Sequence, residues 1–104
     1  MQSLKLKITG KVYHTGYRYF IKQKASQLKI SGFISYCSDQ SVEILATGEN
    51  DYLDVFIKYC RIGNKDSCVG GISMSQIPVV KLDSFEVVED GTLIFNDPSP
   101  DLPL

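Results

Sequence analysis

A histidine, a glycine and an arginine stand close together in the stretch KVYHTGYRYF, which covers residues 11–20. They are His14, Gly16 and Arg18, and they lie between a segment with a strand pattern and a segment with a helix pattern. A glycine lets the backbone approach a ligand closely, and the beginning of a helix favours negative charge. Arg18 can add a charge-assisted, bidentate contact. The stretch therefore predicts a loop that binds an anion such as a phosphate group.

The three cysteines do not suggest a second kind of site. Cys37, Cys60 and Cys68 are odd in number and widely spaced. A disulfide framework uses an even number of cysteines, and a zinc site uses close pairs. We expect three reduced thiols in a cytoplasmic protein, and neither a disulfide nor a zinc site. Cys37 follows Tyr36 near the predicted site, and we interpret it as a structural thiol.

The elements on either side of the loop can be read from their periodicity. Apolar residues alternate with polar ones over residues 4–8, which predicts a half-buried strand. The helix after the loop has one apolar face: Tyr17, Phe20, Ile21, Ala25 and Leu28.

The rest of the chain repeats a similar pattern. Strands are predicted over residues 33–37 and 42–47, and the turn Ser38–Ser41 makes them a hairpin. A second helix is predicted with Asn50 or Asp51 as its N-cap, the buried stripe Leu53, Phe56, Ile57 and Cys60, and a stop at Gly63. A strand over about residues 72–77 and a short strand over residues 85–88 follow.

The order strand, helix, strand, strand, helix, strand predicts an α+β, ferredoxin-like βαββαβ sandwich. We expect an antiparallel sheet of four or five strands with two helices on one face. One domain should cover residues 1–90. Asp90-Gly91 should turn the chain towards residues 93–95, and residues 91–104, which carry three of the four prolines, should form a partly disordered extension.

Composition excludes several classes of function. The 104 residues carry a net charge of −1, which disfavours nucleic-acid binding. No apolar run approaches the roughly 20 residues of a membrane helix, and the first ten residues lack the pattern of a secretory signal. We expect a monomer that binds neither nucleic acid nor membrane.

The loop and the order of elements together resemble the acylphosphatase family, whose loop has the form G-x-V-Q-G-V-G-F-R. The matching stretch here is GKVYHTGYR, over residues 10–18. Four positions match outright: Gly10, Val12, Gly16 and Arg18. Tyr17 is a mild change from the family's Phe, and Thr15 replaces a Val.

Two further blocks extend the resemblance to about residues 3–88. The family's G-W-V-R-N, followed by a turn and a strand beginning V-E, corresponds to GFISY over residues 32–36 and VEI over residues 42–44. The family's G-P-x-x-A-x-V corresponds to GNKDSCV over residues 63–69. The three blocks occur in order on the expected elements.

The resemblance implies an enzyme that hydrolyses acyl phosphates to a carboxylate and phosphate without a metal or cofactor. The loop would bind the phosphate of a small-molecule acyl phosphate, or inorganic phosphate, through these residues: Tyr13, His14, Thr15, Gly16, Tyr17 and Arg18. Arg18 matches the catalytic Arg. The family's catalytic Asn, which orients the attacking water, is replaced by Tyr36, and its Gln and first internal Gly are replaced by Tyr13 and His14.

These replacements leave several hypotheses open. Tyr36 is either a working substitute for Asn or the mark of a site no longer used for catalysis, and we favour the second. His14, the one histidine, is either a new acid, base or anion contact or an exposed loop residue, which we favour. We expect slow or absent acyl phosphate hydrolysis. The alternative is a non-catalytic anion-binding or protein-interaction module. An RNA-binding sheet is disfavoured, because the strand VEILAT carries no aromatic residue for base stacking.

Overall fold

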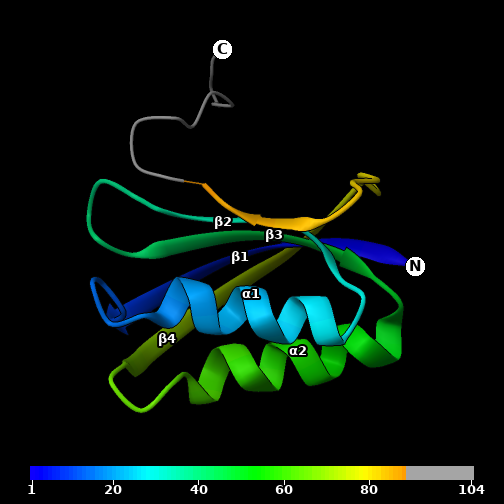
Figure 1. Ribbon diagram of the computed structural model, residues 1–104. Helices are drawn as coiled ribbons and strands as arrows, with labels where there is room; N and C mark the ends of the chain where they lie inside the picture. The colour runs from blue at the N-terminus through cyan, green and yellow to red at the C-terminus, as the bar shows by residue number, and fades with distance from the viewer. Residues whose placement is uncertain (89–104) are drawn as a thin grey trace.

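The computed structural model of the chain describes residues 1–88, and seven elements follow one another in this part. They are β1 (Gln2–Lys11), α1 (Tyr17–Gln27), β2 (Ser31–Tyr36), β3 (Val42–Gly48), α2 (Asn50–Ile62), β4 (Cys68–Ile77) and β5 (Phe85–Val87). The sheet has the order β4-β1-β3-β2-β5, and both helices cover the same face of it (Figure 1). The predicted ferredoxin-like α+β fold is therefore confirmed.

The sheet is mixed, whereas the sequence predicted antiparallel pairing throughout. The pairs β1–β3, β1–β4 and β2–β3 are antiparallel, but β5 runs parallel to β2, from Gly32 opposite Phe85 to Ile34 opposite Val87. Residues 78–84 return the chain from β4, at one edge of the sheet, to the other edge. There β5 runs parallel to β2. The alternation of residues within one strand does not show in which direction that strand pairs with its neighbour.

Strand β4 begins at Cys68, four residues before the predicted start at residue 72. Its first residues pair with the end of β1, from Lys11 opposite Cys68 onwards. The early part contains Gly70 and Gly71, which have no side chain to show an alternation. Pairing with β1 therefore extends β4 over residues 68–71, whose own pattern does not predict a strand.

The core lies between the sheet and the two helices. Its largest fully buried side chains are Tyr17, Phe56, Leu6, Ile8, Ile21, Ile34, Ile44, Leu53, Val12, Val42 and Cys60. Phe20, Leu28 and Ile57, which the helix patterns also assigned to the core, are only partly buried and pack against its edge. The core thus joins the beginning of α1 to the inner face of β1, β2 and β3.

The predicted turn between β2 and β3 is stabilised by the side chains of Asp39 and Ser41. Asp39 accepts hydrogen bonds from the hydroxyl of Ser41 and from the N–H of Ser41, the latter at 3.0 Å. These bonds, with Lys7 at 3.2 Å, lower the pKa of Asp39 to about 2. The turn fixes the position at which β2 ends, which is Tyr36.

Tyr17 connects the two helices through a buried hydrogen bond. Its hydroxyl donates to the carbonyl of Cys60 at 2.6 Å, which satisfies one of the last carbonyls of α2. Burial raises the pKa of Tyr17 far above its usual value, so the hydroxyl remains protonated and can donate.

Tyr17→Phe should lower the free energy of unfolding by about 1–3 kcal/mol, because a buried carbonyl loses its partner. Urea denaturation of this variant beside Tyr52→Phe, whose ring is 48% exposed, measures the loss. Equal stabilities for the two variants would show that the Cys60 carbonyl does not depend on Tyr17.

Three predictions fall on residues that the structure does not describe. The C-terminal extension over residues 91–104 and the predicted turn towards residues 93–95 lie beyond residue 88. The proposed domain limit at residue 90 also lies there. Within residues 1–88, neither helix has the length and apolar character needed to cross a membrane.

Candidate active site

Two glycines shape the loop that connects β1 to α1. Gly10 has a φ of 117° at the point where the register between β1 and β4 shifts, and a Cβ there would overlap the backbone of Cys68 and Gly70. Gly16 has a φ of 80° and directly precedes α1. Both conformations favour glycine, so the two matches to the family loop have a structural reason.

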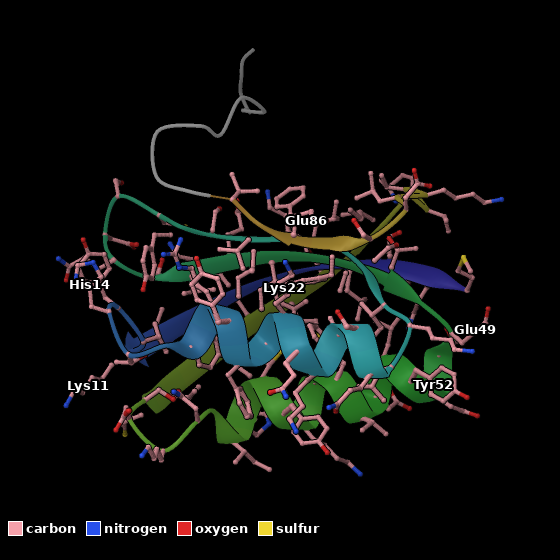
Figure 2. All side chains as sticks on the ribbon, in the orientation of Figure 1. Lys11, His14, Lys22, Glu49, Tyr52 and Glu86 are labelled. Carbon is pink, nitrogen blue, oxygen red and sulfur yellow. The ribbon has the colours of Figure 1, made fainter. Side chains whose placement is uncertain are left out.

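His14 also adopts a left-handed conformation, with a φ of 55°. This backbone angle is one that glycine provides at no steric cost and that histidine tolerates better than most residues. The imidazole is exposed and stacks on the ring of Tyr13, with centroids 3.9 Å apart. Figure 2 shows His14 at the end of the molecule where β1 leads into α1, with Tyr52 and Glu49 at the opposite end.

The hydroxyl of Tyr36 lies against the loop. Tyr36 ends β2 and is 9% exposed, and its Oη accepts a hydrogen bond from the backbone N–H of His14 at 2.7 Å. Its ring lies 4.6 Å from the ring of Tyr13, centroid to centroid. A donor that a bound anion could use is therefore already paired with a neutral oxygen.

Arg18 covers the same tyrosine. Its guanidinium carbon lies 3.9 Å from the centroid of the Tyr36 ring, which is a cation–π contact. Its Nη1 also donates to the carbonyl of Val88 at 3.4 Å. Arg18 thus extends from the first turn of α1 to the end of β2, and it reaches the residue at the position of the family Asn.

The remaining loop residues contribute backbone groups. The first hydrogen bond of the α1 ladder runs from the N–H of Phe20 to the carbonyl of Gly16 at 3.1 Å. The N–H groups of Thr15, Gly16 and Tyr17 come before that bond, where helices bind anions. The Thr15 hydroxyl donates to the carbonyl of Val12 at 3.1 Å, which stabilises the loop. The side chain of Tyr17 lies in the core, so only its backbone can serve the loop.

Asn64 is a loop contact that the sequence did not predict. It follows α2 in the chain, but its Nδ2 donates to the carbonyl of Thr15 at 2.7 Å. Among the described residues, its Oδ1 is buried without a hydrogen-bond partner. The one signal was its place in the third family block, directly after Gly63. This amide supports the loop from the side of α2.

The neighbouring titratable groups do not add a nucleophilic thiol or a metal centre. Cys37 is partly buried, and burial raises the pKa of its thiol, which disfavours the thiolate. Within residues 1–88, no group of three or more His, Cys, Asp or Glu side chains could hold a metal ion. The predicted site residues Tyr13, His14, Arg18 and Tyr36 do lie together.

Comparisons with known proteins agree with this geometry. The acylphosphatase family profile matches residues 4–87, which end with β5. The acylphosphatase of Pseudothermotoga lettingae is 34% identical over 88 residues, covering 85% of this chain and 99% of that protein. The acylphosphatase of Archaeoglobus fulgidus is 32% identical over 87 residues, covering 84% of this chain and 98% of that protein.

A solved structure shows the same arrangement of elements. The crystal structure of acylphosphatase from Bacillus subtilis superimposes with a TM-score of 0.82 at 29% identity, covering 85% of this chain and 99% of that chain. The family profile, the relatives and the solved structure therefore agree from β1 to β5. The chain belongs to the acylphosphatase family.

Proposed function

We propose that this chain binds the phosphate of an acyl phosphate, or inorganic phosphate, in the loop from Tyr13 to Arg18, and hydrolyses acyl phosphates slowly. Family membership supports acyl phosphate hydrolase-like chemistry. The loop offers backbone donors at the beginning of α1, and Arg18 supplies the positive charge. The reaction needs no metal or cofactor, because the donors and the guanidinium stabilise the phosphoryl oxygens.

The main support for a slow rate is the 2.7 Å hydrogen bond between the His14 N–H and the Tyr36 hydroxyl. An acyl phosphate must displace that hydroxyl to use the His14 donor. In-line attack also needs a water held on the side of phosphorus opposite the leaving oxygen. An amide at the end of β2 can both donate to a water and accept from it. The phenol of Tyr36 fills that space instead.

The same contact favours one alternative, an anion-binding module without turnover. Both functions require phosphate at the loop, and they differ only in whether carboxylate and phosphate are released. Measuring phosphate release from acetyl phosphate beside phosphate binding separates them.

We further propose a monomer that works in the cytoplasm, consistent with the free thiols of Cys37, Cys60 and Cys68.

Arg18→Ala should weaken phosphate binding by roughly 10- to 100-fold, the scale of a lost hydrogen bond to a charged group. Thermal stabilisation by added phosphate and isothermal titration calorimetry measure the loss. Arg61→Ala is the matched control, because it removes the same charge from an exposed position in the last turn of α2. Equal binding by the two variants would place the anion away from Arg18.

A further inference from the structure

The hydroxyl of Tyr36 is itself an oxygen nucleophile held at the loop. We propose that Tyr36 is a phosphoryl acceptor: an acyl phosphate bound at Tyr13–Arg18 transfers its phosphoryl group to Tyr36 Oη. This inference rests on the proposed function, because the donor must bind in the loop first. It adds a covalent product, phosphotyrosine at residue 36, which hydrolysis does not form.

The contacts of Tyr36 place its oxygen beside an incoming phosphate. Oη lies 2.7 Å from the N of His14, and a phosphate bound in the loop would compete with it for that N–H. When a phosphate oxygen accepts the His14 N–H, the displaced hydroxyl remains next to the phosphorus. The Tyr36 ring is held on two sides, because the guanidinium carbon of Arg18 lies 3.9 Å from its centroid and the Tyr13 ring centroid lies 4.6 Å from it. These contacts limit how far the ring can move away. Reacting atoms about 3–3.5 Å apart are close enough for attack.

Burial of Tyr36 also determines the direction of attack. Its side chain is 9% exposed, so it forms the inner wall of the site, whereas His14 on the loop is exposed. The acyl group of the donor needs room and must point outwards to solvent. The leaving oxygen then lies on the far side of phosphorus from Tyr36, which is the in-line arrangement that phosphoryl transfer requires.

The step balances without another reactant. A bond forms between Tyr36 Oη and phosphorus, the bond between phosphorus and the acyl oxygen breaks, and the acyl group leaves as a carboxylate. The phenolic proton passes to solvent. Phosphoryl transfer proceeds through a loose transition state, so positioning and charge stabilisation matter more than activation of the nucleophile. The loop N–H groups and Arg18 provide that stabilisation.

The product should persist. Hydrolysis of the phosphate ester would need a water in line with phosphorus and opposite Oη, on the solvent side of the site. The ester phosphate would stay among the loop donors beside Arg18. We therefore expect each protein molecule to accept a single phosphoryl group at Tyr36.

The experiment is incubation of the full chain with acetyl phosphate, followed by intact-mass and fragment mass spectrometry. We expect one phosphoryl group on Tyr36 in the natural protein and none on residue 36 of Tyr36→Phe. Arg18→Ala should be modified at least tenfold more slowly. Thermal stabilisation by inorganic phosphate is measured in the same preparations, which shows independently whether the loop binds the anion.

Each other outcome contradicts the inference. An unmodified Tyr36 in a natural protein that phosphate stabilises would remove the transfer step and leave the proposed function intact. Phosphorylation of other residues alone would show direct reaction with acetyl phosphate from solution instead of transfer in the loop. Modification of Tyr36 at the same rate in Arg18→Ala as in the natural protein would show the same. An absence of phosphate stabilisation with no modification would remove the loop site and the transfer together.

Discussion

Tyr36→Asn should raise the rate of acyl phosphate hydrolysis by on the order of a hundredfold, the scale of one well-placed catalytic group. The substitution removes the hydroxyl that accepts the His14 N–H and restores a short amide at the end of β2. The amide leaves room for a water and can orient it towards phosphorus. Steady-state release of phosphate from acetyl phosphate measures the change.

His14 should limit this gain. Its φ of 55° is a conformation that glycine adopts without strain, and its ring stacks on Tyr13. The double variant Tyr36→Asn with His14→Gly should therefore be faster than either single variant.

Tyr52→Asn, at the opposite end of the molecule, is the control for the tyrosine-to-asparagine change (Figure 2). High turnover by the natural protein that falls in Tyr36→Asn would show that Tyr36 is a working substitute. In that case the slow-hydrolysis proposal would have to be abandoned.

Tyr36→Phe should bind inorganic phosphate roughly 2- to 10-fold more tightly than the natural protein. The hydroxyl no longer competes for the His14 N–H, and a net hydrogen bond is worth about 0.5–1.5 kcal/mol. The ring and its contact with Arg18 are retained, so the shape of the site changes little. Hydrolysis should not rise with affinity, because phenylalanine cannot orient a water.

Isothermal titration calorimetry of Tyr36→Phe beside Tyr52→Phe measures the effect. Unchanged or weaker binding by Tyr36→Phe would mean that the hydroxyl lies outside the anion site or assists binding. Either result would contradict the competition inferred from the His14–Tyr36 bond.

Much of the fold could be predicted because its strands and helices differ in period. Alternation in β1 and β3 and the apolar stripes of the helices each match a buried face, and those faces meet in one core. Two features could not be predicted in this way. The start of β4 depends on pairing with β1 near Gly70 and Gly71, and the direction of β5 depends on the path of residues 78–84.

The candidate site, too, could be predicted from the sequence only in part. Local spacing identified Gly16 and Arg18, because both belong to one short stretch of chain. The contacts that decide the chemistry join distant residues: the Tyr36 hydroxyl with His14, and the Asn64 amide with Thr15. Side-chain length and the packing of β2 against the loop determine them, and neither is visible in spacing.

The most direct test of the phosphate site is a crystal structure of the natural protein grown with phosphate. We expect the anion within hydrogen-bond distance of the loop N–H groups between Tyr13 and Arg18 and of the Arg18 guanidinium. The bond between the His14 N–H and Tyr36 Oη, 2.7 Å long without an anion, should be broken. A phosphate bound elsewhere, or an intact His14–Tyr36 bond at saturating phosphate, would contradict the proposed site.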